Sequence, residues 1–197
     1  MVRNLNHARL TYYFPLLKKP DREVASRGLM LLAAFLFGLL IPSRFSVTMT
    51  PSLVHRIYLI SRITDAREIK KDSYVLFTLR KSYIRNGQPV DVMSLVVLEE
   101  KRKDGKPSAH VPVMKIARCT PGEYLRVEEG RYYCNNEYLG TAKEYSLRGE
   151  KVEHFVYDGI VPEGKIFVMG EHRDSFDSRY FGFIEVKDVT AIGHAVW

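Results

Sequence analysis

The densest run of polar and charged side chains lies between Gly170 and Gly182, directly after the apolar residues 166–169. Asp177 and Arg179 are two positions apart within it, and this spacing places both side chains on one face of an extended chain. Four aromatic residues in the run or just after it supply enough apolar surface to bury it: Phe176, Tyr180, Phe181 and Phe183. Buried polar groups need partners, so the run is either a solvated turn or part of a site.

A serine–histidine–aspartate triad is the first chemistry that these residue types suggest, with His172, Asp177 and either Ser175 or Ser178 as its members. Such triads converge from distant segments of a chain. Residues this close along one extended segment cannot easily meet in the required geometry. We therefore reject the triad and look for the nucleophile and the base elsewhere.

Lys115 is the one charged residue in the apolar run 111–117, which has the pattern of a buried strand. A lysine on such a strand either reaches water from its edge or stays buried. Burial disfavours the charged form and lowers the pKa toward neutrality. A neutral amine is a competent general base and can activate a serine without a histidine or an aspartate.

A third stretch, residues 48–53, contains three hydroxyl side chains around a proline. Pro51 restricts Thr50 to an extended conformation, so the segment presents its hydroxyl groups, that of Ser52 included, at a rigid bend. Taken alone, it is an ordinary loop.

The elements that position these stretches are mostly strands. Six short runs from residue 45 onward are rich in β-branched and aromatic residues and are separated by turn clusters: 75–79, 90–98, 111–117, 124–127, 165–169 and 183–186. Helical character is confined to 55–73, with a turn or two around 64–71. We therefore predict that residues 43–197 form a mainly antiparallel β domain.

The N-terminal part has a different character. Residues 1–23 form a basic leader, and residues 28–41 carry no charge. As a helix, that apolar run would span about 21 Å, short of the roughly 30 Å hydrocarbon core, but residues 24–26 can lengthen it while Arg27 reaches back to the headgroups. We expect an uncleaved transmembrane anchor over 24–42, with the leader in the cytoplasm and residues 43–197 on the periplasmic side of the inner membrane. A cleavable signal peptide and a buried soluble helix are the alternatives, although no small-x-small cleavage site follows the run.

Composition excludes several other classes. The net charge of +7 comes from scattered basic residues interleaved with acidic ones, and no nucleic-acid-binding signature is present, so we predict no nucleic-acid partner. Cys119 and Cys134 lack metal-site spacing, and the histidines show no paired ligand spacing, so we predict no metal and no other cofactor. Outside the cytosol the two cysteines could be bridged; two unpaired thiols are the alternative.

Together, the three stretches resemble the signal peptidase I family of serine–lysine proteases, most strongly its conjugative-transfer (TraF-type) branch, from about Val47 to the C-terminus. The matching motifs are Thr50-Pro51-Ser52-Leu53 with Tyr58, Lys115 with Pro121-Gly122-Glu123, and the box from Ser175 to Gly182. The sequence departs from the pattern at Val54 and Arg56, where the branch commonly has proline and glycine. It also has Gly170-Glu171-His172 where the family has Gly-Asp-Asn.

The resemblance implies a fold and a role for each matching residue. The fold would be an antiparallel signal-peptidase-like β fold behind one transmembrane helix. Ser52 would be the nucleophile and Lys115 the general base, and the Ser52 N–H and Thr50 hydroxyl would form the oxyanion hole. Ser175 would orient Lys115. Asp177 and Arg179 would form a charge-assisted pair that supports the frame of the site.

The implied activity is a membrane-anchored endopeptidase that removes signal or leader peptides from exported precursors. For the transfer branch, the substrate would be a pilin precursor of a conjugative type IV secretion system. Ser52 follows Ile41 by only 11 residues, which would hold the site near the membrane surface, and such precursors bind as an added strand. The alternatives are a general signal peptidase I, a cytosolic self-cleaving repressor, which requires an N-terminal DNA-binding domain, and a non-enzymatic membrane-tethered β module for assembly.

Overall fold

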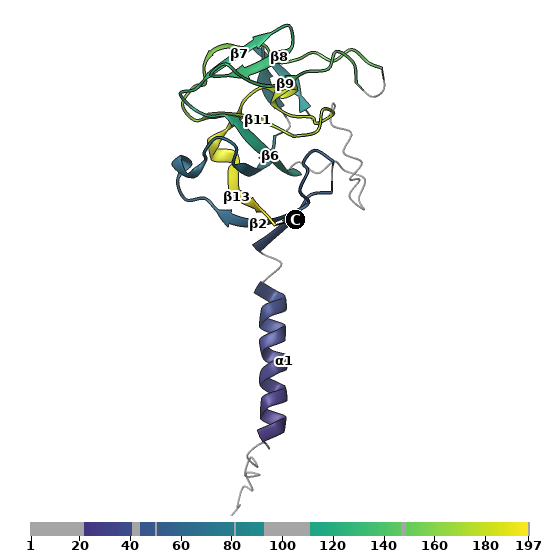
Figure 1. Cartoon of the computed structure of the whole chain (residues 1–197), viewed down its shortest axis with the longest axis vertical. Helices are drawn as coiled ribbons and strands as arrows, with labels where there is room; N and C mark the ends of the chain where they lie inside the picture. The colour runs from purple at the N-terminus through teal and green to yellow at the C-terminus, as the bar shows by residue number, and fades with distance from the viewer. Residues whose placement is uncertain are drawn as a thin grey trace, which may run out of the picture. The chain divides into compact units, whose positions relative to one another are not determined.

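The computed structural model describes residues 22–40, 44–49, 51–80, 82–92, 111–146 and 149–196. The chain divides into two units, residues 1–41 and 42–197. The described part of the first unit is one helix, α1 (Arg22–Leu40) (Figure 1). Its residues 22–38 are exposed. No helix within the described ranges combines the length and the apolar character needed to cross a membrane.

The second unit is built from strands that all pair in antiparallel fashion. A seven-stranded sheet has the order β1-β2-β13-β3-β6-β11-β12, a four-stranded sheet the order β10-β7-β8-β9, and β4 and β5 form a hairpin. Figure 1 shows β7, β8 and β9 at one end of this unit and β2 and β13 at the other, with β6 and β11 between. The strands are β1 (Phe45–Val47), β2 (Ile57–Arg62), β3 (Tyr74–Leu79), β4 (Ser82–Arg85), β5 (Gln88–Asp91), β6 (Val111–Cys119), β7 (Tyr124–Glu128), β8 (Arg131–Cys134), β9 (Glu137–Thr141), β10 (Asp158–Ile160), β11 (Lys165–Met169), β12 (Ile184–Glu185) and β13 (Val189–Ala195).

The prediction of a mainly antiparallel β domain is confirmed, and the predicted runs 75–79, 111–117, 124–127 and 165–169 fall in β3, β6, β7 and β11. The expectation of helical character over 55–73 is wrong for its first part, because residues 57–62 form β2 between β1 and β13. Only a short 3-10 turn, Ala66–Glu68, is helical in that stretch. Most of the predicted run 90–98 lies outside the described residues.

Alternation of side chains along the strands divides the core among three clusters. On β3, Val75, Phe77 and Leu79 are buried in the first cluster, on one face of the large sheet. The second cluster lies between β11 and the four-stranded sheet and includes Leu125, Tyr132 and Phe167. The third cluster is smaller and is formed by Leu53, Tyr58, Met114 and Ile116.

Cys119 and Cys134 form a disulfide bond, so of the two alternatives for these cysteines the structure has the bridge. The bond links the end of β6 to the end of β8, and both cysteines are fully buried in the second cluster. It therefore ties the strand that carries Lys115 to the four-stranded sheet.

Candidate active site

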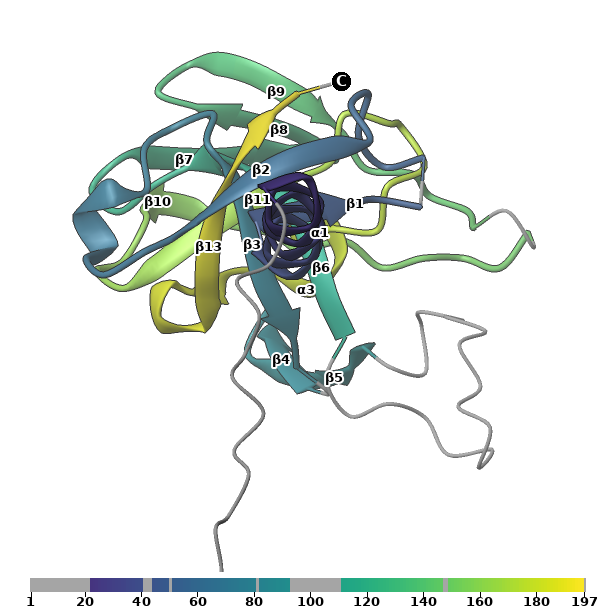
Figure 2. The same ribbon diagram turned by 90° about the horizontal axis from the view of Figure 1, so that it is seen from below.

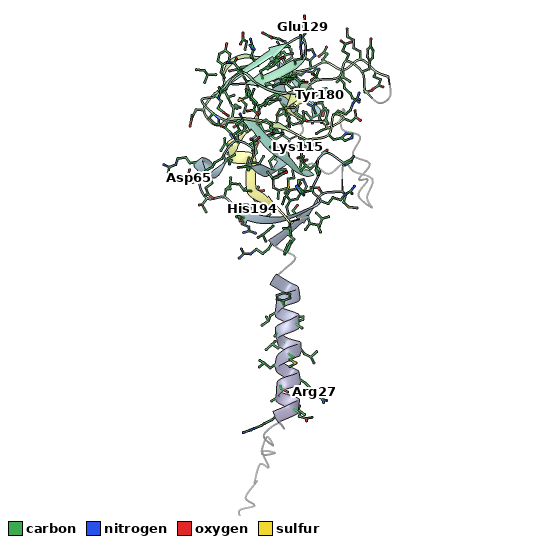
Figure 3. The ribbon with its side chains drawn as sticks, viewed as in Figure 1. Arg27, Asp65, Lys115, Glu129, Tyr180 and His194 are labelled. Carbon is green, nitrogen blue, oxygen red and sulfur yellow. A yellow bond between two sulfur atoms is a disulfide. The ribbon has the colours of Figure 1, made fainter. Side chains whose placement is uncertain are left out.

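Lys115 lies on β6, in the middle of the β domain, between Glu129 near one end and His194 near the other (Figure 3). Its side chain is only 4% exposed, and Nζ donates a hydrogen bond of 2.8 Å to Ser175 Oγ. The contact is possible because β11 stops pairing with β6 beside Lys115: the last pair of the two strands joins Met169 to Ile116. After that pair the chain leaves the sheet and turns back with Ser175 beside Lys115.

Burial lowers the pKa of Lys115 to about 8. The nearby Asp177 carboxylate opposes this shift, and the Arg179 guanidinium adds to it. Because the two charges are paired with each other and act in opposite directions, desolvation decides the result. A substantial fraction of the amine is therefore neutral near physiological pH, as a general base requires.

Ser52 lies in the turn before β2 and is held through its backbone carbonyl. That oxygen accepts hydrogen bonds from the N–H groups of Glu171 (2.8 Å) and His172 (3.2 Å). The next residue, Leu53, is 5% exposed and packs in the cluster with Met114 and Ile116, the two neighbours of Lys115 on β6. The loop that carries Ser52 is thus anchored both to the turn after β11 and to β6.

Gly170 is the point where these segments meet. A β-carbon added there would overlap Ser175 Oγ and lie 2.7 Å from the Ser52 carbonyl oxygen. No side chain fits in that space, so a glycine is required. The structure therefore brings the backbone of Ser52, the hydroxyl of Ser175 and the amine of Lys115 into one neighbourhood. Thr50 lies outside the described residues.

Asp177 and Arg179 form a bidentate ion pair with two bonds of 2.8 Å, and both side chains are buried, at 0% and 3% exposure. Asp177 also caps the short helix α3 (Ser178–Phe181) and accepts from Gly170 N–H at 2.9 Å. Arg179 donates to the backbone carbonyls of Ser175 (3.2 Å) and Thr141 (3.0 Å). The pair thereby holds Gly170 and Ser175 in place.

Two further contacts at this site involve residues to which the sequence assigned no role. Ser178 Oγ accepts from Val168 N–H at 2.9 Å and so joins α3 to β11. Glu171 Oε2 accepts from Val54 N–H at 2.7 Å. The signal of Glu171 in the sequence is its place directly after Gly170, where the family motif Gly-Asp-Asn also has an acidic residue.

Two other features of the described residues do not coincide with this site. Cys119, Glu123 and Cys134 are close enough to surround a metal ion, but both sulfur atoms are committed to the disulfide, so no thiolate ligand is available. A hollow of about 400 Å³ lies elsewhere on the domain and touches neither Lys115 nor the Ser52 loop. It is lined by Ile63, Thr64, Asp65, Gly164, Glu185, Val186, Lys187 and Val189.

Comparison with known families places the chain in a class of peptidases. The profile of the family described as "Signal peptidase, peptidase S26" matches residues 23–197. The chain belongs to this family, which confirms the resemblance to signal peptidases. The match does not separate the conjugative-transfer branch from the others.

Individual relatives cover smaller parts of the chain. It is 34% identical to signal peptidase I of Haemophilus influenzae over 84 residues. This aligned segment covers 39% of this chain and 23% of that protein. The chain is 30% identical to signal peptidase I V of Bacillus subtilis over 94 residues. This second segment covers 42% of this chain and 56% of that protein. The matched segments thus span about a quarter and about half the length of these relatives. A crystal structure of a signal peptidase I from Enterococcus faecalis V583 aligns with 24% identity and a TM-score of 0.31, covering 62% of this chain and 96% of that one.

Proposed function

We propose that this chain is a membrane-anchored serine endopeptidase in which Ser52 is the nucleophile and Lys115 the general base. One observation carries the proposal: an almost fully buried lysine with its pKa lowered to about 8 lies in hydrogen-bond contact with Ser175. The same turn that holds Ser175 also binds the backbone of Ser52. A buried neutral amine next to a serine-bearing loop is the arrangement that serine–lysine catalysis needs.

In this mechanism the neutral Lys115 amine takes the proton from Ser52 Oγ as the oxygen attacks the scissile carbonyl. The oxyanion is stabilised by the Ser52 N–H and the Thr50 hydroxyl, and losing one such donor typically costs about 2.7–4 kcal/mol of transition-state stabilisation. The Lys115 ammonium then gives its proton to the leaving amine. Lys115 next removes a proton from water as the water oxygen attacks the acyl carbon. The bond from this carbon to Ser52 Oγ then breaks, and the Lys115 ammonium returns the proton to Ser52 Oγ.

Ser175 acts in this mechanism as a positioning residue. A neutral amine has two N–H groups and one lone pair, and the bond from Nζ to Ser175 Oγ restricts rotation about the last side-chain bond. The lone pair is thereby kept in one direction. Asp177 and Arg179 support Ser175 through its backbone carbonyl and take no part in proton transfer.

The substrate class follows from the expected setting of the domain. A basic leader (residues 1–23) and an anchor (residues 24–42) would hold the peptidase domain (residues 43–197) at the periplasmic face of the inner membrane, where signal peptides of exported precursors emerge. The resemblance to the conjugative-transfer branch makes a pilin precursor of a type IV secretion system the proposed substrate.

The test is processing of a precursor by Ser52→Ala and Lys115→Ala variants. Each should abolish cleavage while leaving the protein folded by circular dichroism. Ser61→Ala and Lys70→Ala are matched controls, because they remove the same side chains from exposed positions and should cleave normally. Full processing by either site variant would refute the assignment.

A general signal peptidase I is the second candidate, favoured by the names of the two curated relatives. Complementation of a strain depleted of its housekeeping signal peptidase separates the two. A pilin specialist fails to restore growth, and a general enzyme restores it. A non-enzymatic assembly module, in contrast, would have an exposed Lys115, and the 4% exposure of this side chain argues against it.

A further inference from the structure

Glu171 contacts the loop that carries Ser52 at two points. Its backbone N–H donates to the carbonyl oxygen of Ser52 at 2.8 Å, and its carboxylate accepts from the N–H of Val54 at 2.7 Å. The N–H of His172 adds a second, longer bond to the same carbonyl. One residue therefore binds the loop on both sides of Leu53, although it is 117 positions away from Val54.

These bonds determine the orientation of two consecutive peptide groups. The Ser52 carbonyl belongs to the peptide group between Ser52 and Leu53, and the Val54 N–H belongs to the next one. Leu53, between them, is buried at 5% exposure in the third cluster. With both peptide groups bound and the intervening side chain packed, the backbone next to the nucleophile has little freedom to rotate.

The surroundings of the carboxylate are consistent with this role. Tyr58 and Tyr74 lie beside Glu171. Burial is the largest cause that raises the pKa of each phenol; Tyr74 and then Glu171 add to the shift of Tyr58, and Glu171 adds to that of Tyr74. Both phenols therefore stay protonated, and the Tyr58 hydroxyl donates to the carbonyl of His55 at 2.9 Å. Besides the Val54 N–H, the Glu171 carboxylate shares a side-chain hydrogen bond with Tyr74, which also raises the pKa of that phenol.

We propose that Glu171 is a positioning residue for the nucleophile, which holds the backbone of Ser52 and Val54 in the orientation that attack requires. This inference rests on the proposed role of Ser52. Because Glu171 itself is exposed, its contribution concerns the geometry of the site more than the global stability of the fold. Charge-assisted bonds of this kind are short and strong, and small misplacements of reacting groups are costly in rate.

The length of the side chain provides a sharp test. Glu171→Gln keeps an acceptor oxygen at the same reach, Glu171→Asp withdraws it by one methylene, and Glu171→Ala removes it. In full-length protein in detergent, we expect the Glu171→Gln variant to stay within about threefold of the original kcat. Glu171→Asp and Glu171→Ala should lower kcat by roughly 10- to 100-fold with little change in KM. Glu163→Ala is the matched control, since it removes an exposed glutamate far from the loop in sequence.

A second measurement does not depend on activity. Amide hydrogen exchange of residues 52–56, measured in the same protein, should be faster in Glu171→Ala than in Glu171→Gln or Glu163→Ala, because the Val54 N–H loses its acceptor. Faster exchange in Glu171→Ala alone supports the inference. Equal exchange in all variants overturns it.

The two proposals fail in different ways. If Ser52→Ala is inactive but Glu171→Ala cleaves at the original kcat, the positioning role is refuted and the proposed function stands. If Ser52→Ala still cleaves, the proposed function fails, and the positioning role of Glu171 for the nucleophile is overturned with it. A change in KM alone, or an equal loss in Glu163→Ala, also refutes the positioning role.

Discussion

Lys115 combines a titratable amine with an almost fully buried position. Its pKa of about 8 is lower than the ordinary value of 10.5, chiefly because of desolvation. At this one residue, the burial that gives the β domain its core also produces a base that works near neutral pH. The contact to Ser175 then gives that base a direction.

Catalysis should therefore depend on pH through this group. Only the neutral amine can accept the serine proton, so kcat/KM should rise with pH and level off above about 8. Below that value it should fall about tenfold per pH unit. Initial rates of peptide cleavage between about pH 6 and 10 give the profile, and a rate that stays constant across the window would contradict a Lys115 base.

The same shift should be visible in stability. Since the folded pKa lies below the unfolded value of 10.5, the unfolded chain binds more protons between pH 8 and 10.5, and stability rises with pH across that window. A shift of this size corresponds to roughly 3 kcal/mol. Lys115→Met removes the titration, so we expect this variant to be the more stable protein at pH 7 and the gap to shrink toward pH 10.5. Urea unfolding of both proteins at about pH 7 and about pH 10.5 measures the difference between their free energies of unfolding. A difference that is independent of pH would contradict the assignment.

At the scale of elements, the turn between β11 and α3 organises the site. It contains Gly170, Glu171 and Ser175, and it is supported by the buried pair of Asp177 and Arg179. The pair also joins this turn to β9 through the carbonyl of Thr141. A frame that is held by a buried ion pair is sensitive to the loss of one partner, because the other charge is left without compensation.

Asp177→Ala should therefore destabilise the protein by about 3–5 kcal/mol. It leaves the Arg179 guanidinium buried and unpaired and removes the acceptor of Gly170 N–H. In the double variant Asp177→Ala/Arg179→Met neither charge of the pair remains, so its loss of stability should be smaller than the sum of the losses in the two single variants. Urea unfolding of the original protein, the two single variants and the double variant completes a double-mutant cycle. Strictly additive losses of unfolding free energy would argue against a coupled buried pair.

At the scale of the whole molecule, the chain separates into the unit 1–41 and the unit 42–197. All three core clusters and every described residue of the site belong to the second unit. The hairpin β4–β5 follows β3 at one end of that unit (Figure 2), and a hydrogen bond from Arg85 to the Tyr180 carbonyl joins it to α3. The second unit therefore has the core and the site that an independent peptidase domain needs.

We expect residues 42–197 alone to fold and to cleave a soluble peptide within about threefold of the full-length rate. If the proposed anchor holds the enzyme to the membrane, cleavage of a membrane-inserted precursor should instead slow by roughly 10- to 100-fold, because enzyme and substrate would no longer be confined to one surface. Parallel assays on the peptide and on precursor in vesicles test this. Equal loss on both substrates would show that residues 1–41 support the fold, and equal retention would argue against the anchor.

Several strands could be predicted because their signal is local. The runs in β3, β6, β7 and β11 are apolar, β-branched and bounded by turns, and they stay in the sheet. β2 was missed because the stretch 55–73 has a mixed pattern, and its strand exists through pairing with β1 and β13. β13 brings the C-terminal residues between β2 and β3, a pairing that no local pattern records.

The sequence by itself determined the residue types and the family motifs. It left two alternatives for Lys115, an edge position that reaches water or a buried one, and the structure has the buried one. The family resemblance implied that Ser175 orients Lys115, and the structure has the hydrogen bond between them across 60 positions. Only the tertiary structure decided that Gly170 must be a glycine and that Glu171 binds Val54 across 117 positions. Periodicity tells which face of a strand is buried. It does not tell which distant backbone group a side chain will meet, because that depends on the register of β6 and β11 and on the packing of Leu53 in the third cluster.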